Sequence, residues 1–249
     1  MRFHLGLLKI FLMSYKCLYT NGDSWTYGDE IEFGGSNVNN PTLRYYNTWP
    51  WFLSKELSIG VCINDGSQGA SNYRIFRRTL KFIFDWVESK KNPNELMIVI
   101  GWTTPERQEI PITDINSKTS YVKLLLNTSN IYDPKYGNYL LDKVNEYGKL
   151  YYELVDIPAM EKMMINHMKV LRIMCNYYGI KYFDFIAVGD DPTEIKNNYE
   201  NEFKNLFPIS FLSKVEFEKW PVYKHNHPTI ESHKKWSKEL KKFIDEYSI

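Results

Sequence analysis

Residues 96–101 read LMIVIG, an unbroken apolar run that follows the breaker residues Asn92, Pro93 and Asn94. A short apolar run bounded in this way is typical of a strand that is covered on both faces. The preceding residues 73–90 predict a helix, because apolar side chains recur there at three- and four-residue spacing. The pair indicates a helix packed against a buried strand.

The same alternation extends in both directions along the chain. Strands are predicted at residues 16–20, 58–63 and 181–188, and helices at residues 49–57, 159–178 and 230–247. Strands that alternate with helices favour a mainly parallel sheet, here of about five strands, with helices on both faces. The fold class is therefore α/β, in one domain over residues 14–249 after an extension at residues 1–13. Residues 31–47 read as a loop, and residues 111–152 as an insertion that is loop-like at PITDINSKTS and helical in part.

Charge and composition narrow the function classes. The chain has 249 residues with 31 basic and 30 acidic side chains, so its net charge of +1 gives no field that would draw nucleic acid. Cys17, Cys62 and Cys175 lack the spacing of a metal site, and an odd number favours reduced thiols in the cytoplasm. Residues 1–13 are too short to span a membrane, although a signal or anchor function for them stays open. The oligomeric state stays open as well.

Four polar loops each follow a predicted strand: residues 21–24, 66–72, 101–107 and 189–193. The carboxyl ends of parallel strands meet at one edge of a sheet, which is where ligands bind in open α/β folds. We therefore expect these loops to gather along one edge and to hold any functional site.

Three stretches carry a family resemblance: NGDSWTYGDE at residues 21–30, SQGASN at residues 67–72 and HNHPTIESHKKWSKEL at residues 225–240. Together they resemble the SGNH or GDSL hydrolase superfamily over residues 16–240. The resemblance implies a three-layer, flavodoxin-like fold and a serine esterase or lipase activity without a metal or organic cofactor.

On that resemblance Ser24, which follows Asp23 in the GDS motif, is the nucleophile, and His227 ahead of Pro228 is the base. The chemistry requires such a pair, because a serine hydroxyl is a weak nucleophile until an imidazole accepts its proton. The alternative for Ser24 is a turn or helix-capping serine. His225 and His233 are interpreted as a surface residue and a helix-face residue.

Two residues of the family pattern are missing. The resemblance implies an oxyanion hole made by the backbone N–H groups of Ser24 and Gly69, but Thr103 stands where the family has an asparagine. The Thr103 hydroxyl is one substitute donor, and Asn72 is another unless it caps the helix that follows.

The second missing residue is the aspartate three positions before the histidine, which is Lys224 here. A carboxylate could instead come from Asp190, Asp191 or Glu231, or the site could work as a dyad. Losing an oxyanion donor costs about 10² to 10³ in rate, and losing the orienting carboxylate about 10⁴. The site is therefore either rebuilt with other residues or no longer catalytic.

Residues near this edge also suggest a substrate surface. Arg107 could clamp an anionic group with Glu106 positioning it, or the two could form an internal ion pair. Trp25 and Trp102, with Tyr27, would make the edge aromatic and suited to sugar rings.

These observations predict a serine-dependent hydrolase of a small acyl ester, with an O-acetylated glycan as one candidate substrate. A catalytically degenerate fold that binds glycans or serves a structural role is the competing hypothesis, and acyl transfer to an acceptor other than water is a third.

Overall fold

The computed structural model describes residues 15–31, 40–113, 119–124, 138–198 and 202–247. Its main sheet contains β1 (Cys17–Asn21), β2 (Val61–Asn64), β3 (Leu96–Trp102) and β6 (Lys181–Ile186). The spatial order is β2-β1-β3-β6, and all neighbouring strands are parallel. The predicted α/β class with a parallel sheet is confirmed.

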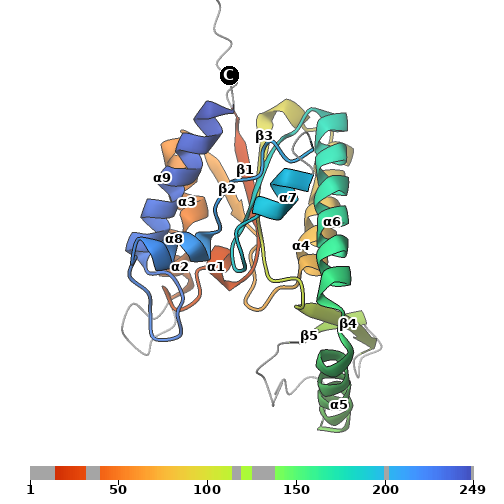
Figure 1. The fold of residues 1–249 in the computed structure, drawn as a ribbon. Coiled ribbons are helices and arrows are strands. Elements are labelled where there is room, and N and C mark those ends of the chain that lie inside the picture. Colours follow the sequence, from red (N-terminus) through yellow and green to blue (C-terminus); the bar gives the residue numbers. More distant parts are fainter. Residues whose placement is uncertain (1–14, 32–39, 114–118, 125–137, 199–201, 248–249) are drawn as a thin grey trace, which may run out of the picture.

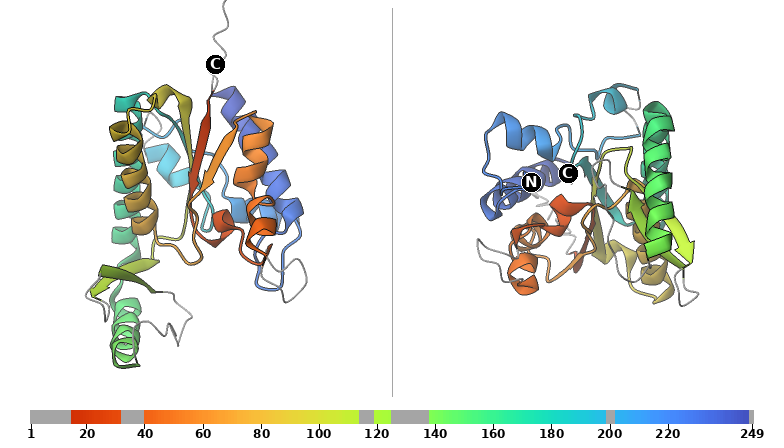
Figure 2. Two further views of the ribbon diagram at one scale, coloured as in Figure 1. Left: turned by 180° about the vertical axis from the view of Figure 1, so that it is seen from behind. Right: turned by 90° about the horizontal axis from the view of Figure 1, so that it is seen from below.

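Helices cover both faces of this sheet, as Figures 1 and 2 show. One face packs against α4 (Asn72–Glu88) and α6 (Ile157–Tyr178), and the other against α3 (Trp49–Glu56), α8 (Phe211–Phe217) and α9 (Ile230–Glu246). The predicted helices at residues 49–57, 73–90, 159–178 and 230–247 are all confirmed to within a few residues.

The central strand β3 shows why the sheet is buried on both sides. Successive side chains of a strand point to opposite faces. Leu96, Ile98 and Ile100 accordingly join the core under α4 and α6, whereas Met97 and Val99 join the core under α3, α8 and α9. All seven residues of β3 are buried, so the continuous apolar run reflects two cores that share one strand.

The expected fifth strand is reduced to a single bridge in the described part of the chain. Leu206 lies parallel to Asp184 of β6, and Phe207 N–H donates to the Asp184 carbonyl at 2.8 Å. The segment leaves the edge of the sheet after this contact. The short helices α7 (Thr193–Asn198) and α8 lie on either side of it in the sequence.

The insertion predicted at residues 111–152 forms an arm that consists of two strands and one helix. β4 (Gln108–Thr113) and β5 (Thr119–Leu124) pair antiparallel, and α5 (Asn138–Leu154) follows them. The loop assignment was wrong for residues 111–113, 119 and 120, where a two-stranded ribbon packs Val122 and Leu124 against Tyr151 and Tyr152. Residues 114–118 and 125–137 lie outside the described residues. The arm projects beyond the carboxyl ends of the strands, past the amino-terminal end of α6 (Figure 1).

The predicted loop at residues 31–47 is described in part, and the extension at residues 1–13 is not described. A short helix, α2 (Pro41–Tyr45), interrupts the predicted loop at residues 31–47, and residues 32–39 of that loop lie outside the described residues, as does the extension at residues 1–13. Among the described helices, none combines the length and the apolar character that crossing a membrane would need.

Candidate active site

The loops after β1, β2 and β3 meet at the carboxyl edge of the sheet, as expected. α1 (Ser24–Tyr27) begins directly after β1 and is only four residues long. Gly22 makes this turn fit, because a Cβ there would stand 2.8 Å from the Gly101 carbonyl oxygen and 2.2 Å from Thr26 Oγ1. Gly66 lies against the other side of the turn, where a Cβ would meet the Tyr27 nitrogen at 2.7 Å.

Asp23 joins the first and third loops. Its fully buried carboxylate accepts the Trp25 N–H through Oδ1 at 3.0 Å and so caps α1. Its Oδ2 accepts from Thr103 Oγ1 at 2.9 Å and from Arg107 Nη1 at 3.0 Å. Ionic hydrogen bonds of this kind are among the strongest in proteins. Asp23 therefore has a structural role in holding the serine turn against the end of β3.

These contacts correct the interpretation of two predicted residues. The Thr103 hydroxyl donates to Asp23 and is not presented to an oxyanion. Arg107 pairs with Asp23, and among the described residues it makes no ion pair with Glu106. The Glu106 carbonyl instead accepts a hydrogen bond from Tyr151 of the arm at 3.2 Å.

Asn72 joins the second and third loops. Its amide donates to the carbonyls of Thr103 and Thr104 at 2.9 and 3.3 Å, and its Oδ1 accepts the Thr103 N–H at 2.9 Å. The cap of α4 is Ser71, whose hydroxyl accepts the Arg74 N–H at 3.1 Å. Asn72 is thus neither the cap nor oriented as an oxyanion donor; it fixes the backbone after β3.

Ser24 is the first residue of α1 and is 6% exposed. Among the described residues, neither its hydroxyl nor its N–H makes a hydrogen bond, whereas its carbonyl accepts from Gly28 and Asp29 at 2.9 and 3.0 Å. The Gly69 N–H also has no partner in the described chain, and Gly69 adopts a left-handed backbone with φ of 58°. Two N–H groups on adjacent loops of this edge are therefore available to an acceptor.

His227 faces two carboxylates that follow α1. Its Nδ1 lies 2.9 Å from Glu30 Oε2, and its Nε2 lies 3.5 Å from Asp29 Oδ2. The Glu30 carboxylate also accepts the backbone N–H of His225 at 3.2 Å. Because a carboxylate can only accept, the contact with Glu30 places a proton on His227 Nδ1, while Nε2 faces the carboxylate of Asp29.

Local backbone geometry brings Glu30 and His227 together. Gly28 ends α1 with φ of 83° and Glu30 has φ of 67°, so the chain turns sharply after the serine helix. On the other side, Tyr223 N–H donates to the His227 carbonyl at 2.8 Å, closing a tight turn in which Asn226 has φ of 63°. Small or polar residues tolerate such left-handed conformations best.

The carboxylate that contacts His227 Nδ1 is that of Glu30. The three candidates considered from the sequence lie elsewhere: Glu231 pairs with Lys235 at 2.9 Å, and Asp191 accepts the Ser210 N–H at 2.7 Å. Asp190 lines a separate cavity together with Asp191. The signal for Glu30 was present in the sequence, since a carboxylate pair directly follows the YG that ends the serine turn.

Ser24 and His227 lie on the same edge of the sheet but share no hydrogen bond in the described structure. Asp29 connects them: its N–H donates to the Ser24 carbonyl, and its Oδ2 lies 3.5 Å from His227 Nε2. The imidazole is thus held beside the turn that Ser24 begins.

The prediction of an aromatic substrate surface is wrong for Trp25 and Trp102. Trp102 is fully buried and donates its indole N–H to Asp184 at 3.1 Å. Trp25 is 6% exposed and packs edge-on against Phe211. Both rings belong to the core: Trp102 packs in the core under α4 and α6, and Trp25 in the core under α3, α8 and α9. Tyr27 instead lies against the guanidinium of Arg44.

His233 is more than a helix-face residue, because it is completely buried. Its Nδ1 accepts the Trp49 N–H at 3.2 Å and so joins α9 to the start of α3. Burial lowers the pKa of His233 to about 3, with a smaller contribution from His227. It is a neutral structural side chain next to the histidine turn.

A cavity of about 770 Å³ opens between the loop after β3, the start of α6 and the loop after β6. Glu106, Thr104 and Asp190 are among its lining residues, whereas Ser24 and His227 are not. In the described residues no group of three or more His, Cys, Asp or Glu side chains is arranged to hold a metal ion.

Residues 32–202, more than half of the chain, match the model of a family of unknown function, DUF6071. The chain belongs to this family. The matched segment contains the loops after β2 and β3, and it begins after Ser24 and ends before His227. No curated protein matches the chain.

Several solved structures are distantly similar. A putative lipolytic protein of the G-D-S-L family from Desulfitobacterium hafniense has 14% identity and a TM-score of 0.47, covering 92% of this chain and 99% of its own. A carbohydrate esterase family 2 enzyme with a carbohydrate binding domain, from Corynascus thermopiles (Myceliophthora fergusii), has 12% identity and a TM-score of 0.48 over 94% of this chain and 67% of its own. A G-D-S-L family lipolytic protein from Veillonella parvula has 11% identity and a TM-score of 0.44 over 93% and 97%.

Proposed function

We propose that the protein is a serine-dependent hydrolase of small acyl esters. Ser24 is the nucleophile, His227 the base, and Glu30 the carboxylate that orients the base. The observation that carries the proposal is the 2.9 Å contact between Glu30 and His227 Nδ1, because an oriented imidazole is what converts a serine hydroxyl into a nucleophile.

The reaction follows from these roles. The Ser24 oxygen attacks the ester carbonyl while its proton passes to His227 Nε2, the nitrogen that is not bonded to Glu30. The oxyanion accepts hydrogen bonds from the N–H groups of Ser24 and Gly69, which have no other partner in the described residues. Collapse of the intermediate releases the alcohol, which takes the proton from His227. Water then hydrolyses the acyl-enzyme by the same steps.

A fluorophosphonate probe tests the nucleophile directly. Labelling of the folded protein is expected, with complete loss in Ser24→Ala. The matched control is Ser67→Ala, since Ser67 lies on the neighbouring loop of the same edge and should leave labelling unchanged. Hydrolysis of 4-nitrophenyl acetate should follow the same pattern.

The second candidate is a degenerate hydrolase fold that binds glycans without cleaving them. Two observations favour a loss of catalysis: Ser24 is only 6% exposed, and His227 Nε2 lies 3.5 Å from the carboxylate of Asp29. Absence of probe labelling in wild-type protein that is folded by circular dichroism would select this alternative.

A further inference from the structure

The cavity between the loops after β3 and β6 combines apolar and charged walls. Its volume is about 770 Å³, and small-molecule sites usually occupy roughly 300 to 1,000 Å³. Met164 and Ile165 of α6, Ile186 of β6 and Ile195 of α7 line it with apolar surface. Such a surface favours an organic ligand that has an apolar part. The charged lining residues are Glu106, Glu161, Asp190, Asp191 and Lys162.

The formal charge of this lining is negative. Four carboxylates stand against one ammonium, although the whole chain has a net charge of +1. The start of α6 also lies at the cavity, since Ile157 and Pro158 line it, but the positive end of a helix is equivalent to only about half a charge. Asp156 already caps that end by accepting the Ala159 N–H at 3.2 Å. The cavity therefore favours a cation over an anion.

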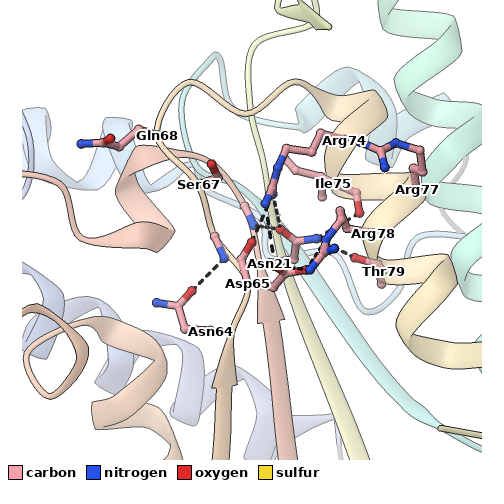
Figure 3. Close-up of polar contacts among 12 residues, drawn as sticks. Asn21, Asn64, Asp65, Ser67, Gln68, Arg74, Ile75, Arg77, Arg78 and Thr79 are labelled. Atoms are coloured by element: carbon pink, nitrogen blue, oxygen red, sulfur yellow. Dashed lines mark hydrogen bonds and ion pairs between the residues drawn. The ribbon is translucent and has the colours of Figure 1, made fainter. Parts of the chain in front are cut away.

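A carboxylate on the other side of this sheet edge is neutralised within the chain. After β2, Asp65 forms a bidentate pair with Arg78, through Nε at 3.0 Å and Nη2 at 2.9 Å. Arg74 Nη2 lies 3.7 Å from the same carboxylate. Figure 3 shows both arginines reaching Asp65 from the first two turns of α4. The charge of Asp65 is thus used by the fold.

The carboxylates of the cavity differ from Asp65 in this respect. Within the described part of the chain, the side chains of Glu106, Glu161 and Asp190 make no hydrogen bond and no ion pair. Arg107, the next residue after Glu106, is paired with Asp23. Asp191 is the exception, because its Oδ1 accepts the Ser210 N–H at 2.7 Å. Three of the four lining carboxylates therefore keep their charge available to a ligand.

The loops after β3 and β6 approach each other closely at the cavity wall. Gly189 has φ of 132°, and a Cβ there would stand 3.3 Å from Ile186 Cγ2 and 3.9 Å from Thr104 Cγ2. The Thr104 hydroxyl is buried and has no hydrogen-bond partner in the described residues. Buried polar groups of folded proteins usually have a partner. The wall thus contains one polar group that the described chain leaves unsatisfied.

The cavity adjoins the proposed acyl site without including it. Thr103 lines the cavity, and its hydroxyl donates to Asp23, the residue before Ser24. Neither Ser24 nor His227 is among the lining residues. Binding in the cavity therefore does not depend on whether Ser24 is a nucleophile.

We propose that this cavity binds an amphipathic organic cation, a primary amine joined to an apolar group such as an aromatic ring. The ammonium is attracted by the carboxylates of Glu106 and Asp190, which lie on the two facing loops. An ammonium has three N–H donors, and the Thr104 hydroxyl is a further acceptor in the same wall. The apolar group packs against the isoleucine side chains of the lining.

Fluorine NMR titration tests the selection for charge. The probes 4-fluorobenzylamine, 4-fluorobenzyl alcohol and 4-fluorobenzoate are similar in size, and at neutral pH they are a cation, a neutral molecule and an anion. At about 0.15 M salt the wild-type protein should bind the amine about tenfold or more tightly than the alcohol, the difference expected for one ionic hydrogen bond. It should not bind the benzoate. Equal affinities for the amine and the alcohol, or no saturable binding of the amine, would overturn the proposal.

Variants of the lining locate the bound amine. Asp190→Asn and Glu106→Gln each remove one carboxylate and should weaken binding of the amine about threefold to tenfold without changing that of the alcohol. The matched control is Glu153→Gln, because Glu153 is an exposed carboxylate of α5 that does not line the cavity. It should change the affinity by less than about twofold. Equal losses in the control and in the lining variants would mean a diffuse field and would refute the site.

Ser24→Ala separates this site from the proposed acyl site. The variant should bind 4-fluorobenzylamine as tightly as the wild-type protein does, because Ser24 does not line the cavity. A loss of affinity would place the amine in the acyl site and refute the proposal. Circular dichroism of each variant confirms that it is folded.

A last comparison tests the apolar wall. 2-Fluoroethylamine carries the same ammonium without the ring, so it should bind about tenfold or more weakly than 4-fluorobenzylamine because less apolar surface leaves water. Equal affinities of the two amines would reduce the site to an attraction between surface charges and would contradict the assignment of an amphipathic ligand.

Discussion

The turn that carries Ser24 and the turn that carries His227 each contact a carboxylate, but the two carboxylates differ in burial and in their hydrogen-bond partners. Asp23 is fully buried and accepts three hydrogen bonds, from Trp25, Thr103 and Arg107. Glu30 keeps 16% of its side chain exposed and accepts from His227 and from the His225 backbone. Asp23 joins two loops of the fold, whereas Glu30 contacts the imidazole ring of His227.

This difference distinguishes a carboxylate that maintains the fold from one that the proposed reaction uses. A buried carboxylate whose two oxygens both accept hydrogen bonds maintains geometry, and removing it leaves buried partners unpaired. A partly exposed carboxylate bonded to an imidazole contributes little to stability but determines which ring nitrogen carries the proton. Variants of Asp23 should therefore affect folding, and variants of Glu30 should affect the reaction.

The largest expected effect is that of Glu30→Gln on turnover. Gln keeps the shape but cannot stabilise an imidazolium, so kcat for 4-nitrophenyl acetate should fall by about 10³ to 10⁴, as for the orienting aspartate of serine proteases. KM should change little, because the lost interaction belongs to the transition state. The free energy of unfolding should change by less than about 1 kcal/mol. An unchanged kcat would show that the carboxylate does not orient the base.

The next largest effect is that of Asp23→Asn on stability. The amide still accepts the Trp25 N–H, but its NH₂ would face the two donors that Asp23 Oδ2 now accepts. Breaking this buried pair should cost about 3 kcal/mol in the free energy of unfolding, measured by urea titration. Asp85→Asn is the matched control, because Asp85 pairs with Lys81 on the exposed face of α4, and it should cost less than about 0.5 kcal/mol. Equal costs would abolish the distinction between the two carboxylates.

The elements of the sheet and its helices could be predicted because their signals are local. Apolar periodicity located β3, α4, α6 and α9 to within a few residues. The ribbon β4 and β5 was missed because Pro111 and the polar residues around it are typical of loops. Its strands depend on packing against Tyr151 and Tyr152, which come about thirty residues later.

The site was predictable only where one residue type determines the role. Short motifs predict the roles of Ser24 and His227, and these stay predictions, whereas the roles of Asp23, Arg107 and Asn72 depend on contacts between loops that the sequence does not specify. Glu30 was missed because the family pattern directs attention to Lys224, three residues before the histidine. A replacement from a different loop becomes visible only when the fold brings residues 30 and 227 together.

The smallest expected effect is a pH dependence of the unfolding free energy, and it comes from His233, the buried side chain next to the turn that carries His227. The pKa of His233 is about 3 in the folded protein and 6.5 in the reference state. Below pH 6.5 the unfolded chain therefore binds a proton that the folded chain does not, so stability falls as the pH decreases and is complete above pH 6.5. His233→Gln keeps an acceptor for the Trp49 N–H but does not titrate. The difference in unfolding free energy between wild type and this variant should shrink by about 1 kcal/mol between pH 6.5 and 5.5. A constant difference would mean that His233 takes up its proton in the folded protein as it does in the unfolded chain, so that burial does not lower its pKa.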